Sequence, residues 1–273
     1  MGLVMMYHRV AAKAATLLAA LLLAPAVAAE PATSALDPSA TVALGERAIG
    51  RSVGNYMLVD STGTSFVLQN YRGKPLVISL VYTACSSVCP ATTQHLIDAV
   101  TEANRVFGPD RFAVLTVGFD ARNDTVPRMA QFASMQGIKS ANWSVASGDA
   151  GTIAALLNDL GFSYRAVAGG FDHPTQTTIL DRDGRIVRHV YGDDFPLPMF
   201  MEPMKDVIYG TATPFSFRGI IDRVKFICTA YDPGSRRYRI DFGLLFGAVI
   251  AAFSLFGLAG LILREWIRSA KAT

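Results

Sequence analysis

Short apolar runs alternate with segments of helical periodicity through most of the chain. Two runs, PLVISLVY at residues 75–82 and RFAVLTVGFD at residues 111–120, are apolar almost throughout and rich in β-branched residues, which predicts strands buried on both faces. In three further segments apolar residues recur at helical spacing, and each segment ends at a glycine: Gly108, Gly137 and Gly161. The pattern therefore predicts strands and helices in alternation.

Two hairpins complete this pattern. Residues 55–74, NYMLVDSTGTSFVLQNYRGK, contain two short apolar stretches around DSTG, and residues 177–192, TTILDRDGRIVRHVYG, contain a turn at Asp183 and Gly184. Strands that alternate with helices favour a layered α/β sheet with crossover connections. The fold class predicted from the pattern is therefore α/β.

The first 29 residues have the organisation of a secretory signal peptide. A basic region precedes a short apolar core at residues 14–24, and small residues follow, with cleavage expected after Ala28 or Ala29. The alternative is an uncleaved anchor, but the core is shorter than the ~20 residues that a membrane span needs. Residues 30–46, rich in Ala, Pro, Ser and Thr, are expected to form a flexible linker.

A second membrane signal lies near the other end of the chain. Residues 242–263 carry no charge, and at ~1.5 Å per residue they would cross ~33 Å, which predicts a transmembrane helix. The basic residues of the tail at 264–273 favour its placement in the cytoplasm. The sequence thus predicts a single-pass inner-membrane protein, with a globular domain at residues 47–212 in the periplasm and a juxtamembrane segment at 213–241.

The net charge limits the class of partner. The formal charge is +3, and removal of the signal peptide takes away two basic residues and no acid, which leaves +1. A near-neutral protein lacks the basic patch that nucleic-acid binding requires. We therefore expect no nucleic-acid partner.

Two of the three cysteines, Cys85 and Cys89, lie in TACSSVCP, between the first buried strand and the first helix. The N-terminus of a helix carries partial positive charge and favours thiolate over thiol, and Pro90 is tolerated in a first turn. Thiols four residues apart lie about one helical turn apart, so they can form a disulfide or share a metal ion. A structural disulfide is the plain alternative, but such a small loop constrains the unfolded chain little.

Two thiolates form half of a site for a soft metal ion, and the periplasm supplies such an ion in copper. A copper site needs a further ligand beside the two sulfurs. Of the four histidines, His8 lies in the signal peptide, His189 at an alternating strand position and His95 far along the helix, which leaves His173 in the loop GGFDHPTQTTILD. Two thiolates and one imidazole suit Cu(I) and also accept Cu(II). A closed zinc site would need a fourth ligand, and Cys228, to which we assign no role, lies far downstream.

The segment PMFMEPM contains three methionines, which we expect in one short loop: Met199, Met201 and Met204. Thioether sulfur is a soft Cu(I) ligand, so these residues are candidates for copper transfer. Methionine also fills gaps in apolar surfaces, and this packing role stays open as the alternative for the three residues.

YTACSSVCP, together with FDH ahead of TTILDRDG, resembles the Sco (SenC-type) family over about Asn55 to Tyr209. The resemblance implies a thioredoxin-like fold, with a central sheet flanked by helices. It also implies copper binding and a role in assembling the copper A centre of cytochrome c oxidase. The copper ligands of the family fall on Cys85, Cys89 and His173, with Asp172 beside the histidine.

The segment GFDARNDT resembles a second motif of the family, the loop Asp-Pro-x-Arg-Asp-Thr, but departs from it at Ala121 and Asn123. We take Asp120 in this loop and Asp172 as candidates to orient the metal ligands. The departure bears on partner contacts more than on metal binding. The carboxyl-terminal anchor also differs from family members that are held by an amino-terminal helix.

Four functions compete. The first is copper delivery, in which a donor protein supplies the metal and a copper-site subunit of a respiratory oxidase receives it. The second is a thiol-disulfide reductase, in which Cys85 and Cys89 keep the cysteines of that subunit reduced. A peroxidase of the peroxiredoxin type is disfavoured, because Thr83 stands two residues before Cys85 rather than three. A non-catalytic binding module is the fourth.

Overall fold

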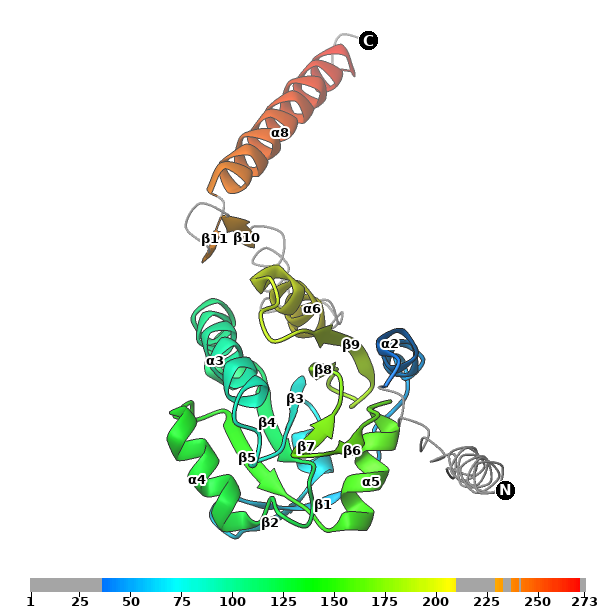
Figure 1. Ribbon diagram of the computed structural model, residues 1–273. Helices are drawn as coiled ribbons and strands as arrows, with labels where there is room; N and C mark the ends of the chain where they lie inside the picture. The colour runs from blue at the N-terminus through cyan, green and yellow to red at the C-terminus, as the bar shows by residue number, and fades with distance from the viewer. Residues whose placement is uncertain (1–35, 210–228, 233–236, 241, 271–273) are drawn as a thin grey trace, which may run out of the picture. The chain divides into compact units, whose positions relative to one another are not determined.

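The structure is a computed structural model that describes residues 36–209, 229–232, 237–240 and 242–270. A mixed sheet of seven strands, in the order β2-β1-β5-β4-β3-β8-β9, forms its centre, and helices flank the sheet (Figure 1). This arrangement confirms the predicted α/β class.

The strands of this sheet are β1 (Met57–Asp60), β2 (Ser65–Val67), β3 (Leu76–Val81), β4 (Ala113–Gly118), β5 (Trp143–Ser147), β8 (Gln176–Leu180) and β9 (Ile186–Tyr191). Two short hairpins lie outside it, β6 (Arg165–Val167) with β7 (Gly170–Asp172) and β10 (Thr229–Asp232) with β11 (Arg237–Ile240). The α-helices are α2 (Pro38–Glu46), α3 (Val88–Phe107), α4 (Val126–Gln136), α5 (Ala150–Asp159), α6 (Leu197–Tyr209) and α8 (Phe242–Ala270). Short 3₁₀ helices are η1 (Leu68–Tyr71) and η2 (Pro109–Arg111).

The two continuous apolar runs form β3 and β4, as predicted. Every residue of both strands is buried, and they pair in parallel along their whole length. On its other side β3 pairs with β8 in the antiparallel direction, with Ser79 opposite Thr177. Because β8 runs the opposite way, the chain ahead of β8 reaches the sheet at the edge where β3 and β4 end.

The three predicted helices are confirmed as α3, α4 and α5, and both predicted hairpins are found, β1 with β2 and β8 with β9. Gly108 and Gly137 are the C-terminal caps of α3 and α4, and both have positive φ angles. Helix α3 packs beside α6 (Figure 1). Strand β5 and the hairpin β6–β7 were not predicted.

The expectation of a flexible linker over residues 30–46 is wrong for the described part of that segment, which forms α2. Asp37 caps the helix by accepting a hydrogen bond from Ser39 N at 2.9 Å, and Thr41 and Gly45 are buried. The helix packs close to Gly161, where an added Cβ would lie 2.7 Å from the Leu44 carbonyl oxygen. Tertiary packing therefore orders a segment whose composition favours a tether.

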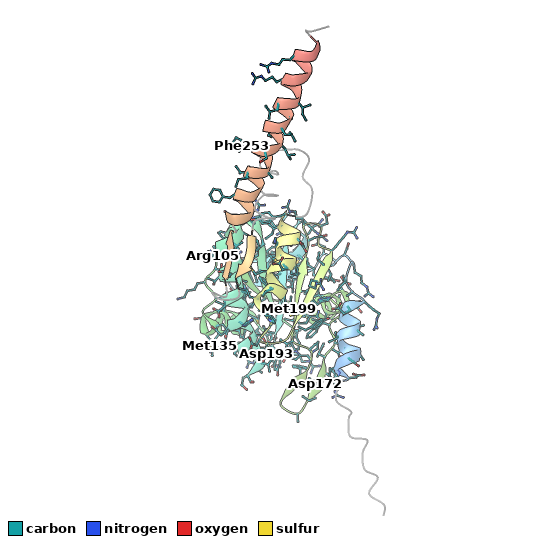
Figure 2. The ribbon with its side chains drawn as sticks, turned by 90° about the horizontal axis from the view of Figure 1, so that it is seen from above. Arg105, Met135, Asp172, Asp193, Met199 and Phe253 are labelled. Atoms are coloured by element: carbon teal, nitrogen blue, oxygen red, sulfur yellow. The ribbon has the colours of Figure 1, made fainter. Side chains whose placement is uncertain are left out.

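The prediction that the methionines share a loop is also wrong. They lie in α6, and the side chains of Met201 and Met204 are fully buried in the core. Of these three methionines, only Met199 is exposed, with 48% of its surface accessible to solvent (Figure 2). Burial removes Met201 and Met204 as copper-transfer ligands, because a metal ion cannot reach them without unfolding the helix.

Several predictions concern the two ends of the chain. Residues 1–29, residues 213–228 and Cys228 lie outside the described residues. Helix α8 covers the apolar segment 242–263. Within the described parts of the chain, however, no helix qualifies by both length and hydropathy to span a membrane. The membrane span stays a prediction.

His189 on β9 makes stability depend on pH. Its Nδ1 lies 2.9 Å from the Thr178 hydroxyl, and burial lowers its pKa to about 4, against the opposing effect of the Gly45 backbone. The folded state therefore resists protonation that the unfolded chain accepts below its ordinary pKa of 6.5. The contribution of His189 to the free energy of unfolding is fully present above pH 6.5 and is lost as the pH drops toward 4.

We expect the free energy of unfolding to fall by about 2 kcal/mol between pH 7.5 and pH 5.0 through this group. Urea denaturation of the full-length chain at the two pH values measures the change. His189→Gln should remove most of the fall, whereas His95→Gln should leave it in place. An equal pH dependence in wild type and His189→Gln would contradict the assignment.

Candidate metal centre

The two cysteines lie in the connection between β3 and α3, as predicted. Both are free thiols; Cys85 is partly exposed, whereas Cys89, in the first turn of α3, is 3% exposed. The Cys89 N–H donates to Cys85 Sγ at 3.2 Å, and the Cys85 N–H donates to the Tyr82 carbonyl oxygen at 3.1 Å. The unpaired N–H groups of the helix start thus point at a sulfur atom.

The two thiols have opposite acidities. Burial acts to raise the pKa of Cys85, but hydrogen bonds from the N–H groups of Cys89 and Ser87, the Cys89 thiol and the Tyr82 hydroxyl outweigh it and lower this pKa. Burial raises the pKa of Cys89 to about 12, despite a hydrogen bond from the Tyr82 N–H, and the neighbouring Cys85 acts in the same direction as burial. The first negative charge of the pair therefore resides on Cys85.

His173 lies between β7 and β8, beside the ends of β3 and β4. Its ring is edge-on to Tyr82 and to Phe119, with centroid distances of 5.7 and 5.2 Å, and it also contacts Phe162. His173 Nδ1 is 2.9 Å from the Pro174 carbonyl oxygen. Because a carbonyl oxygen only accepts, Nδ1 carries the proton and Nε2 keeps the lone pair that a metal ion needs.

These groups suit a soft metal ion. Two sulfur atoms and one neutral imidazole nitrogen are the donors that copper prefers, and no step of unfolding is needed to expose Cys85. Among the described residues, no three His, Cys, Asp or Glu side chains are already assembled as a metal site. The structure brings the two cysteines together and places His173 next to Tyr82, and the three-ligand set stays a prediction.

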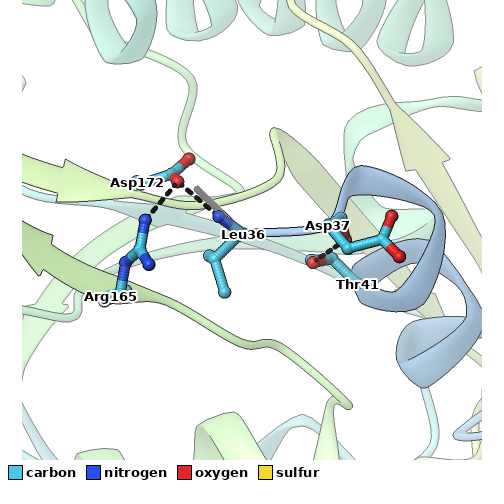
Figure 3. A network of polar contacts seen from close by, with 5 residues as sticks. All are labelled: Leu36, Asp37, Thr41, Arg165 and Asp172. Atoms are coloured by element: carbon cyan, nitrogen blue, oxygen red, sulfur yellow. Dashed lines mark hydrogen bonds and ion pairs between the residues drawn. The ribbon is translucent and has the colours of Figure 1, made fainter. Parts of the chain in front are cut away.

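Asp172 and Asp120 make their polar contacts away from the cysteines and His173. Asp172 Oδ2 accepts from the Leu36 N–H at 3.0 Å and lies 3.4 Å from Arg165 Nη2 (Figure 3). Asp120 Oδ2 accepts from Asn123 Nδ2 at 2.7 Å within its own loop. Asp172 therefore ties the strand before His173 to the start of α2, and Asp120 shapes the loop after β4.

Asp124 is a residue of the site that the sequence reasoning did not single out. It is 2% exposed, and its Oδ1 accepts from both the N–H and the hydroxyl of Thr83 at 2.8 Å, while its Oδ2 accepts from the Asp120 N–H at 2.9 Å. Burial raises its pKa. Asp124 joins the loop that carries the cysteines to the loop after β4, and its position in GFDARNDT was the available signal.

Comparisons with known proteins show a family and a fold. The SCO1/SenC family model matches residues 46–205. A protein of Aquifex aeolicus VF5 whose name indicates electron transfer is 29% identical, with a TM-score of 0.54 over 57% of this chain and 92% of that chain. A SCO1/SenC family lipoprotein of Bacillus anthracis shares the fold, at 17% identity and a TM-score of 0.52 over 58% of this chain and 95% of that chain.

ScoI of Bradyrhizobium japonicum, solved with copper bound, is 23% identical, with a TM-score of 0.45 over 57% of this chain and 97% of that chain. No curated protein matches the chain. The family model and the shared fold confirm the thioredoxin-like architecture that the resemblance implied.

The acidity difference predicts selective alkylation of the metal-free, reduced protein. At pH 7.5 iodoacetamide should modify Cys85 at least about tenfold faster than Cys89, because the thiolate is the nucleophile and Cys85 has the lower pKa. Peptide mapping by mass spectrometry after short reaction times measures both rates. Equal rates, or faster modification of Cys89, would show that the hydrogen bonds do not favour charge on Cys85.

Proposed function

The chain belongs to the SCO1/SenC family, and we propose that it binds copper through Cys85, Cys89 and His173 and helps to assemble a cytochrome c oxidase. The observation that carries the proposal is the pair of free thiols at the start of α3, with the Cys89 N–H 3.2 Å from Cys85 Sγ. A related structure is described as a member of the Sco family of cytochrome c oxidase assembly proteins. The chemistry of the donor atoms supports the metal.

Each of the three ligands has a distinct part in this proposal. Cys85 is partly exposed and is the first contact for an incoming ion, whereas Cys89 is buried and supplies the second sulfur ligand. His173 supplies the nitrogen from a separate hairpin. Copper would enter from a donor protein and leave to the copper A subunit of the oxidase by exchange of soft ligands, so that no free ion is released.

A second function, the thiol-disulfide reductase, is favoured by the difference in exposure between the two thiols. A partly exposed thiolate at Cys85 can attack a disulfide of the target, and the buried Cys89 can then displace the target sulfur. The protein disulfide forms as the target dithiol is released, so electrons and protons balance. Reduction of the target cysteines would prepare them for copper.

We also propose that residues 242–263 hold the chain at the inner membrane, with the domain in the periplasm. The support is the run of 22 residues without a charge, together with the signal-peptide pattern of residues 1–29. A tether would confine the domain near a membrane-bound target and raise its effective concentration.

For the copper site, Cys85→Ser, Cys89→Ser and His173→Ala should each weaken copper binding by more than about 100-fold, since loss of a direct ligand exceeds the 10–100-fold loss for outer partners. The purified full-length chain is titrated with Cu(I) and Cu(II), and metal content and thiolate-to-copper absorption are recorded. His95→Ala is the matched control, because His95 Nε2 lies 2.6 Å from the Phe195 carbonyl oxygen. It should keep one copper per chain.

The same variants separate the two functions. In a disulfide-reduction assay, either cysteine change should end turnover, whereas His173→Ala should spare it. Stoichiometric copper in His173→Ala would refute the three-ligand site, and loss of reduction in that variant would argue against an independent reductase.

For the anchor, the full-length chain should stay with the membrane fraction after extraction with sodium carbonate. A chain that ends at residue 241 should be released by the same treatment, because it lacks the apolar segment. Release of the full-length chain would refute the proposed tether.

A further inference from the structure

The buried carboxylate of Asp124 joins two loops at the edge of the sheet where β3 and β4 end. Residues 82–87, which connect β3 to α3, form the Cys85 loop, and residues 119–125, which connect β4 to α4, form the β4–α4 loop. Asp124 Oδ1 accepts from the N–H and from the hydroxyl of Thr83, both at 2.8 Å. Its Oδ2 accepts from the Asp120 N–H at 2.9 Å. One side chain therefore holds a donor group of each loop.

The β4–α4 loop is fixed by contacts of its own. The N–H groups of Asn123 and Asp124 both donate to the Asp120 carbonyl oxygen, at 2.9 and 2.7 Å. The next residue, Thr125, is the N-cap of α4. Asp124 is thus anchored by short-range backbone bonds and by the start of a helix. Its carboxylate is the fixed point against which Thr83 and the Cys85 loop are held.

The space for this carboxylate is made by Gly118, the last residue of β4. A Cβ at this position would lie 2.5 Å from Asp124 Cβ, 2.9 Å from Asp124 Oδ2 and 2.7 Å from Met129 Sδ. Heavy atoms in a packed protein do not approach so closely, so any side chain at position 118 would displace Asp124 or Met129. The end of β4 is therefore shaped to admit the carboxylate.

The contacts require a group that accepts hydrogen bonds at both ends. Asparagine has the same shape as aspartate, but it offers one acceptor oxygen and one NH₂ group. If its oxygen faces Thr83, its NH₂ group faces the Asp120 N–H, and if it is turned round, its NH₂ group faces the Thr83 N–H. In either orientation one loop loses its acceptor and meets a second donor. Asp124→Asn therefore uncouples the loops without a change in side-chain volume.

We propose that Asp124 is a positioning residue of the metal centre, which holds the Cys85 loop in place, through Thr83, before a metal ion arrives. A loop that is already ordered loses less conformational entropy when a ligand binds to it, so the order of the loop raises the affinity. The statement about copper rests on the proposed function. The statement about the order of the loop does not.

Amide hydrogen exchange of the reduced, metal-free, full-length chain measures the order of the loop. In Asp124→Asn, exchange in residues 82–87 should be about tenfold faster than in the wild type, because a hydrogen bond to a charged group is lost. Exchange in β3 is the internal reference for global opening and should change less. Exchange in residues 82–87 that matches the wild type, or that rises no more than exchange in β3, would overturn the proposal.

Asp159→Asn is the matched control, because Asp159 is also a carboxylate that ties a loop. Its Oδ2 accepts from the Gly54 N–H at 2.8 Å and from the Tyr56 hydroxyl. None of these three residues lies in the Cys85 loop or in the β4–α4 loop. Asp159→Asn should leave exchange in residues 82–87 at the wild-type rate. Equal exchange of that loop in the two Asp→Asn variants would count against a specific role of Asp124.

Two variants of Thr83 approach the same contact from the other side and leave the carboxylate intact. Thr83→Val removes the hydroxyl and keeps the N–H, whereas Thr83→Ser keeps both donors. Exchange in residues 82–87 should therefore be faster in Thr83→Val than in Thr83→Ser. Equal exchange in the two variants would show that the hydroxyl bond to Asp124 does not hold the loop.

Copper titration of the same full-length chains tests the consequence for the metal centre. Asp124→Asn should weaken copper binding by about 10–100-fold, as expected for the loss of an outer partner, whereas Asp159→Asn should change it by less than about twofold. Wild-type affinity in Asp124→Asn would overturn the positioning of the metal centre. A wild-type chain that binds no copper would refute the proposed function instead, and the exchange rates alone would then decide whether Asp124 orders the loop.

Discussion

The antiparallel pairing of β8 with β3 is the constraint on which the rest of the site depends. Strands β3 and β4 run in parallel and end at the same edge of the sheet, and β8 begins at that edge because it runs the opposite way. Residues that follow β3 and β4 therefore meet residues that precede β8. The cysteines, the Asp124 loop and His173 lie at the same edge of the sheet for this reason, although His173 is 84 residues from Cys89 in the sequence.

The start of α3, at this edge of the sheet, supplies a hydrogen-bond donor to the Cys85 sulfur. The Cys89 N–H donates to Cys85 Sγ at 3.2 Å, and although burial acts to raise the pKa of Cys85, hydrogen bonds of this kind lower it. A lower pKa means that the Cys85 thiol gives up its proton more readily when a metal ion binds. A lower pKa also makes Cys85 the better nucleophile of the pair, so the same geometry supports both the proposed copper site and the proposed disulfide exchange.

The sequence predicted the elements that bury continuous apolar runs or end at glycines, which are β3, β4, α3, α4 and α5. It did not predict α2, because an Ala-, Ser- and Thr-containing segment becomes helical here through its contact with Gly161. The methionine segment was predicted to be a loop, but burial of Met201 and Met204 stabilises α6 around Pro203. In each case a long-range contact overrides the local composition.

The site shows the same division between local and long-range information. The spacing of Cys85 and Cys89 and the chemistry of His173 are readable along the chain, because each follows from residue type and the nearest element. The contacts of Tyr82 and Asp124 are not, because both side chains act across loops that only the folded sheet brings together. From the sequence alone, a tyrosine that follows an apolar strand is predicted to be one more aromatic residue of the core. Only the folded structure shows that its ring lies edge-on to Phe119 and to His173, and so joins the end of β4 to the residues before β8.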